Sequence, residues 1–222
     1  MGLHEPTNKT YLRVSLGKIR KTSDKSDALA KERKTDKGDI VYERVWNAVS
    51  GTLEDITFFD HKDYGKSWTV LIKDGEDNFA VQVHEDSRYG IDLLKKIPRL
   101  QKGYSIKITP YDFEVNNKRK IGLSIEQEGV KVETFYQKFT DEGNGKYKVE
   151  NLYGFPNFEG DSKDKDDLKI YFTKVAKFLR GKAQEHIDGN FKRALPESIA
   201  DEIYKNSSVT DAGTDDIEDL PF

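Results

Sequence analysis

Aromatic and basic side chains alternate along one short segment of the chain. Tyr42, Arg44 and Trp46 occupy every second position, and Glu43 and Val45 stand between them. Successive side chains of a β-strand point to opposite faces, so these three would share one face. Flat rings stack on unpaired bases, and cations neutralise a phosphate backbone. The segment therefore predicts a surface suited to single-stranded nucleic acid.

The same residue types recur on the first strand, around a hairpin near residue 64 and in a basic turn near residue 119. The full candidate set for nucleic-acid binding is Arg13, Arg20, Tyr42, Arg44, Trp46, Phe59, His61, Tyr64, Lys66, Trp68, Tyr111, Lys118, Arg119 and Lys120. A core position is the alternative for both tryptophans, above all for Trp68, which shares a face with Val70 and Ile72. A solvated turn is the alternative for residues 118–120.

Motifs of catalysis are missing from the sequence. It contains no phosphate-binding loop, no nucleophile elbow, no zinc-protease motif and no cysteine, and its four histidines lack metal-ligand spacing. The acidic cluster 161–167 precedes a predicted helix, where carboxylates favour the helix dipole, so it needs no metal to explain it. We expect no enzyme activity, no cofactor and no metal site.

Composition divides the charge between a body and a tail. The chain has 37 basic and 40 acidic side chains, and five of the acids lie in the last dozen residues, which leaves 37 against 35 elsewhere. A mildly basic body permits nucleic-acid binding. With no cysteine, no secretory pattern and no long apolar run, we expect a cytoplasmic protein.

Turn residues separate a series of strand-like segments. Strands are predicted at 11–20, 40–48, 51–59, 67–74, 78–84, 105–114, 120–126 and 130–136, with one helix from Ser87 to Ile97. This order is typical of the OB-fold, a five-stranded barrel that often binds oligonucleotides. We therefore predict an OB-fold barrel at 40–138, preceded at 1–39 by a strand and a mobile basic arm without regular structure from Thr22 to Asp39.

The remainder is predicted to be helical and then disordered. An apolar stripe predicts a helix from Asp164 to Ile187, and a proline starts a short one at 196–204, which makes 139–206 a helical extension. The fold class is thus mainly β with C-terminal helices. Residues 207–222 form an acidic tail with an apolar tip, which suits a small apolar pocket rimmed by basic residues. The candidate partner-binding residues are Asp215, Asp216, Ile217, Glu218, Asp219, Leu220, Pro221 and Phe222.

The tip Asp-Leu-Pro-Phe and the strings Tyr64-Gly-Lys-Ser-Trp, Leu94-Lys-Lys-Ile-Pro98 and Pro110-Tyr111 carry a resemblance. The chain resembles phage-type single-stranded DNA-binding proteins of the OB-fold class. The resemblance implies a protein that coats single-stranded DNA in replication, recombination and repair, in the host bacterial cytoplasm if phage-encoded. It also implies that the tail recruits a polymerase, helicase or nuclease. Residues 130–206 have no counterpart in the short bacterial proteins.

Two further expectations concern partners. The acidic tail should compete with DNA for the same cations, because both are flexible polyanions. The alternative function is that of a protein interaction adaptor without direct nucleic-acid binding, in which the helix from Asp164 to Ile187 is the docking element. Self-association is possible in either case. Salt separates the two functions, since phosphate binding weakens steeply with ionic strength and apolar docking does not.

Overall fold

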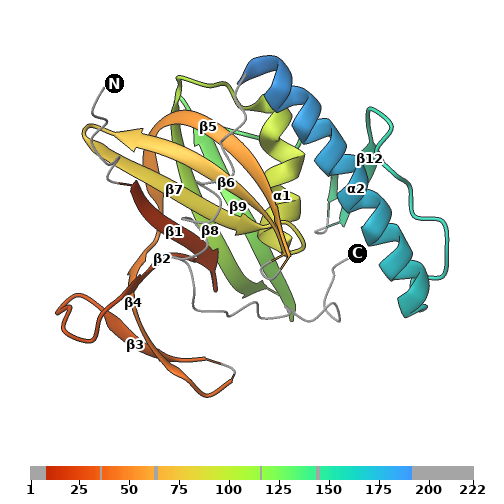
Figure 1. Cartoon of the computed structure of the whole chain (residues 1–222). Coiled ribbons are helices and arrows are strands. Elements are labelled where there is room, and N and C mark those ends of the chain that lie inside the picture. Colours follow the sequence, from red (N-terminus) through yellow and green to blue (C-terminus); the bar gives the residue numbers. More distant parts are fainter. Residues whose placement is uncertain (1–8, 36, 63–64, 116, 144–145, 192–222) are drawn as a thin grey trace.

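The computed structural model describes residues 9–35, 37–62, 65–115, 117–143 and 146–191. This part of the chain is mainly β, and most of its strands form one ten-stranded sheet (Figure 1). In sheet order the strands are β10 (Val130–Lys131), β9 (Lys118–Gln127), β8 (Ser105–Val115), β5 (Val49–His61), β6 (Gly65–Asp74), β7 (Asp77–His84), β1 (Lys9–Ser15), β2 (Lys18–Ser23), β4 (Ile40–Trp46) and β3 (Lys31–Lys34). The remaining elements are α1 (Arg88–Lys96), the 3₁₀ turn η1 (Ile97–Arg99), the hairpin β11 (Gln137–Gly143) and β12 (Lys146–Asn151), and α2 (Lys165–Asn190).

β5 joins the two halves of the sheet because it changes partner along its length. From Thr52 to His61 it pairs with β6, whereas its first residues, Val49 to Thr52, pair with β8. Gly51 lies at the crossing, where an added Cβ would come within 2.5 Å of the Lys73 carbonyl oxygen. A residue without a side chain therefore permits the close approach of β5 to β6 at this point.

The predicted five-stranded closed barrel is wrong, because the sheet remains open. β7 takes β1 as its second neighbour, in parallel, and β9 takes only the short β10. Next to that short pairing, side chains of α1 bind the edge of β9: Asp92 accepts the Leu123 N–H at 2.7 Å, and the Lys96 ammonium donates to the Leu123 carbonyl at 2.5 Å. A helix thus satisfies the edge where a closed barrel would place a strand.

The apolar face of the sheet packs against α1 and α2. Its fully buried side chains include Ile56, Trp68 and Leu123, and Val175 and Leu179 of α2 belong to the same core. The buried Glu85 carboxylate accepts the Trp68 indole N–H at 3.1 Å and pairs with Arg180 of α2. The expected C-terminal helix is confirmed, and Asp164 caps its first turn.

The N-terminal segment is more ordered than expected. β1 and β2 belong to the main sheet, and the predicted unstructured arm contains β3, which pairs with β4 (Figure 1). The predicted strand at 130–136 shrinks to the two residues of β10, and the expected helical extension begins with the β11–β12 hairpin. The predicted helix at 196–204 and the tail at 207–222 lie outside the described residues. Across the described ranges no helix is long and apolar enough to cross a membrane.

Candidate nucleic-acid interface

A row of polar side chains crosses five adjacent strands on the face opposite the core. In register, Thr57 lies beside Thr69, Thr69 beside Gln82, Gln82 beside Arg13, and Arg13 beside Arg20. Paired residues of neighbouring strands point to the same side, so β5, β6, β7, β1 and β2 present these groups together. The structure thereby brings together two predicted residues, Arg13 and Arg20.

Three guanidinium groups converge on one carboxylate at the end of this row. Arg13 and Arg20 of β1 and β2 pair with Glu43 of β4, the latter at 2.6 Å, and Arg33 of β3 pairs with it at 3.1 Å. The Glu43 side chain is 1% exposed, whereas the arginine side chains keep between 10% and 19% exposure. We call the surface formed by Arg13, Arg20, Arg33 and Gln82 the arginine face.

An ionised carboxylate organises the arginine face. Burial alone would raise the pKa of Glu43, but the hydrogen bonds and charges of Arg33, Arg13 and Arg20 outweigh it and lower this pKa to about 2. Glu43 is therefore ionised at neutral pH and fixes the direction of three guanidinium groups. Three cations thus share one buried anion. Such a preoriented array can bind phosphate oxygens.

Further polar and aromatic groups lie on the same side of the sheet. Phe59 pairs in register with Ser67, two residues along from the Thr57–Thr69 pair, and Tyr11 lies two residues before Arg13. Within the described ranges the buried hydroxyl oxygens of Thr57 and Thr69 have no hydrogen-bond partner. Buried hydroxyls normally find partners. Both oxygens are nevertheless enclosed, so they do not face a ligand on the surface.

The side chains predicted to stack along β4 lie on the face opposite the arginine face. Tyr42, Arg44 and Trp46 alternate with the buried Val41 and Glu43, so they share one face as expected, but it is not the arginine face. Arg44 donates to Asp27 at 2.8 Å, Tyr42 donates to Glu32 at 3.2 Å, and Trp46 remains 40% exposed. On this second face an aromatic ring is available, and the arginine is already paired.

The β5–β6 hairpin contributes less than its residue types suggest. Trp68 is 0% exposed and Phe59 is 9% exposed. The burial of Trp68 matches the core alternative, because a ring enclosed by the protein offers no face to a base, and the role of Phe59 stays a prediction. Lys66 lies 4.0 Å from Asp60, and His61 is half-buried. Tyr64 lies outside the described residues.

The β8–β9 hairpin presents cations beside an exposed ring. Lys118 and Lys120 pair in register with Val115 and Phe113, and the Phe113 side chain is 49% exposed. Arg119 points to the opposite side, where it forms two hydrogen bonds of 2.8 Å with Asp112. The turn between β1 and β2 contacts this hairpin, since a Cβ on Gly17 would lie 2.8 Å from the Asp112 nitrogen. The hairpin thus adjoins the strands of the arginine face.

Tyr111 stands at the base of the same hairpin and is half-buried. Its ring covers Gly122, where an added Cβ would lie 2.4 Å from the tyrosine oxygen. Burial, together with Asp92 and Tyr89, raises the pKa of Tyr111 to about 12. Its hydroxyl therefore remains protonated, and its packing role leaves Phe113 as the more accessible ring of this strand.

Four residues of the interface are absent from the candidate set, namely Arg33, Glu43, Gln82 and Phe113. Glu43 organises the arginines, and Gln82 extends their row. A carboxylate between Val41 and Val45 on the inward side of the alternation could have indicated a buried anion that requires cations. The parallel pairing that places Gln82 beside Arg13 leaves no comparable pattern in the sequence.

The candidate partner-binding residues, 215–222, lie outside the described residues, so their role stays a prediction. Among the residues that the structure does describe, no group of three His, Asp or Glu could hold a metal ion. The chain was compared with protein-family models, curated proteins and solved structures, and none of them matches it.

Proposed function

We propose that this protein binds single-stranded DNA through the arginine face and the adjoining β8–β9 hairpin, and that it coats DNA exposed in replication, recombination or repair. The observation that carries the proposal is the convergence of Arg13, Arg20 and Arg33 on the buried Glu43. It supplies preoriented cations on one face of a sheet. Phe113 of the hairpin supplies an accessible ring, whereas the exposed Trp46 lies on the opposite face of β4.

Unpaired strands are favoured over duplexes because the accessible groups suit bases as well as phosphates. Base stacking on an aromatic side chain is worth about 1–3 kcal/mol per base and requires a base that has left the duplex. In the described part of the chain, α2 packs its apolar stripe on the core, and its Arg180 is paired with Glu85. By family resemblance the site of action would be the cytoplasm.

Partner recruitment is assigned to the acidic tail. Leu220, Pro221 and Phe222 follow acidic residues and would enter an apolar pocket rimmed by basic groups on a polymerase, helicase or nuclease. This part of the proposal rests on the sequence alone.

Fluorescence anisotropy tests the proposal directly. A labelled strand of ~30 nucleotides and its duplex are titrated with the full chain at two salt concentrations. The proposal expects tighter binding of the single strand, and binding that weakens steeply as salt rises. Equal affinity for strand and duplex would contradict the stacking surface, and absence of binding would contradict the function as a whole.

A protein interaction adaptor is the second candidate, favoured by a different observation. Phe139, Tyr147 and Val149 lie on one face of the β11–β12 hairpin and are each about half exposed. An apolar face of this kind can dock another protein. The helix first expected to dock is less suited, because Val175, Leu179 and Ala183 of α2 are buried in the core. Affinity for a protein partner that does not respond to salt would favour this function.

A further inference from the structure

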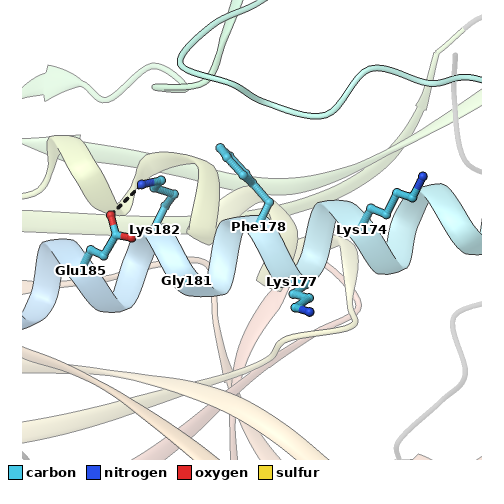
Figure 2. Close-up of a pocket in the computed structure, with 6 residues that line it drawn as sticks. All are labelled: Lys174, Lys177, Phe178, Gly181, Lys182 and Glu185. Atoms are coloured by element: carbon cyan, nitrogen blue, oxygen red, sulfur yellow. Dashed lines mark hydrogen bonds and ion pairs between the residues drawn. The ribbon is translucent and has the colours of Figure 1, made fainter.

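α2 carries a shallow cleft on the side that does not face the sheet. The cleft has a volume of about 390 Å³ and is lined by Lys174, Lys177, Phe178, Gly181, Lys182 and Glu185. Figure 2 shows Lys174, Phe178 and Lys182 rising from the same side of the helix, with Gly181 between the last two. Phe178 forms the apolar base, since it also packs edge-to-face on Tyr136 and Phe155.

The cleft contains a glycine that the helix itself does not require. A Cβ at Gly181 would meet no atom within 4 Å, so no close packing explains the glycine. Glycine in the interior of a helix costs about 1 kcal/mol relative to alanine. Its absence of a side chain leaves the surface between Phe178 and Lys182 open. An apolar base, an open helix surface and three lysines together describe a receptor for an acidic peptide with an apolar end.

We propose that the occupant of this cleft is the chain's own acidic segment, residues 211–222. That segment combines five carboxylates, no Lys or Arg, and the apolar Leu220 and Phe222. Phe222 would pack on Phe178, and the acids would lie along Lys174, Lys177 and Lys182. Lys182 already forms an ion pair with the exposed Glu185 at 2.7 Å, so the carboxylates of residues 211–222 would compete with Glu185 for Lys182.

The length of the intervening chain allows this contact. Residues 192–210 separate α2 from the acidic segment, and 19 residues span up to about 60 Å when extended. Gly181 lies ten residues before Phe191, or about 15 Å along the helix. A linker of this length holds the segment at an effective concentration on the order of millimolar. Weak charge and apolar contacts are then sufficient for binding within one chain.

This inference goes beyond the proposed function, because cleft and tail can meet without DNA. It also affects that function: a tail held on α2 cannot at the same time occupy the arginine face, so the cleft would reduce its competition with DNA.

Disulfide trapping in the full chain tests the contact. The natural sequence has no cysteine, so the double variant Gly181→Cys/Ile217→Cys carries the only two thiols. The matched control is Gly189→Cys/Ile217→Cys, because Gly189 is also an exposed glycine of α2 with open space around it. Gly189 is closer to the tail in sequence, so random collision would favour the control.

The proposal expects intramolecular oxidation of the Gly181→Cys pair to be about tenfold faster than that of the control at low salt. High salt, or the added change Lys174→Glu/Lys182→Glu, should remove this advantage. Equal rates in the two variants would overturn the proposal. So would cross-links formed mainly between chains, which would identify a second copy as the partner. Neither result depends on whether the protein binds DNA.

Discussion

Glu43 is the residue on which the arginine face depends, and its role makes stability depend on pH. Its pKa is lowered from 4.5 to about 2 by three guanidinium groups, and a difference of this size corresponds to about 3 kcal/mol of folding free energy. A carboxylate with a lowered pKa stabilises the fold fully above its unfolded pKa. The contribution is lost as pH falls from about 4.5 to about 2.

We therefore predict that Glu43→Gln lowers the free energy of unfolding at pH 7 and flattens its dependence on pH between 5 and 2. Urea denaturation at a series of pH values measures both effects. Asp60→Asn serves as the control, because Asp60 is exposed and lies 4.0 Å from Lys66. If the free energy of unfolding of the Glu43→Gln variant depends on pH between 5 and 2 as strongly as that of the natural chain, the arginines do not stabilise the charge of Glu43.

The two tryptophans should respond differently to the same substitution. Trp68→Ala removes a side chain that is 0% exposed and hydrogen-bonded to Glu85, so we expect a loss of about 3–5 kcal/mol in stability. Trp46→Ala removes a ring that is 40% exposed, and we expect a change in stability of about 1 kcal/mol or less. Neither ring lies on the arginine face, so a folded variant of either kind should keep its affinity for DNA. Thermal unfolding and parallel DNA titrations measure the stability and the DNA affinity of both variants. A Trp68→Ala variant as stable as the natural chain would contradict the core assignment.

At the scale of elements, the β8–β9 hairpin carries the exposed ring of Phe113 beside Lys118 and Lys120. We predict that Phe113→Ala reduces affinity for single-stranded DNA by about 1–3 kcal/mol, because one stacking face is lost, and leaves the melting temperature nearly unchanged. Val115→Ala is the matched control, since it removes apolar surface from the same face of the hairpin without removing a ring. Similar losses for both variants would indicate a general apolar contact and not stacking.

The sequence predicted most elements but not the way they assemble. The helix at Ser87–Ile97 and the helix at Asp164–Ile187 were found because caps and apolar stripes are local signals. The alternation along β4 was also local, and it correctly grouped Tyr42 with Arg44. Closure of the barrel was not local: it depends on whether β9 or β1 lies beside β7, and both carry similar alternating patterns. The binding of Leu123 by Asp92 and Lys96 could not be inferred from residue types, because a helix rarely replaces a strand at a sheet edge.

The candidate site was predicted only in part for the same reason. Arg13 and Arg20 were chosen as cations near the first strand, but their convergence on Glu43 requires the pairing of β1 with β2 and of β2 with β4. Trp68 was chosen by residue type, and its burial supports the core alternative that its shared face with Val70 and Ile72 had indicated. Residue type thus indicated nucleic-acid binding, whereas the topology selected the face.

At the scale of the whole molecule, the chain separates a basic body from an acidic tail. We predict that deletion of residues 211–222 raises affinity for single-stranded DNA at low salt, because five competing carboxylates are removed. The gain should shrink at high salt, where the tail is screened. Anisotropy titrations of the full and shortened chains measure it. Equal affinity of the two chains at low salt would contradict competition by the tail.

The account depends most on the claim that the arginine face contacts the DNA backbone, and the salt dependence of binding tests it most directly. We would measure the affinity for a single strand over a range of salt concentrations for the natural chain and for Arg13→Gln/Arg33→Gln, which leaves Arg20 paired with Glu43 at 2.6 Å. Lys73→Gln/Lys102→Gln is the control, since both lysines are exposed and neither belongs to the arginine face. Each lost phosphate contact reduces the slope of log affinity against log salt by about 0.7, so the account predicts a decrease of about 1.4 for the arginine variant and little change for the control. An arginine variant that is folded and keeps the natural slope would contradict it.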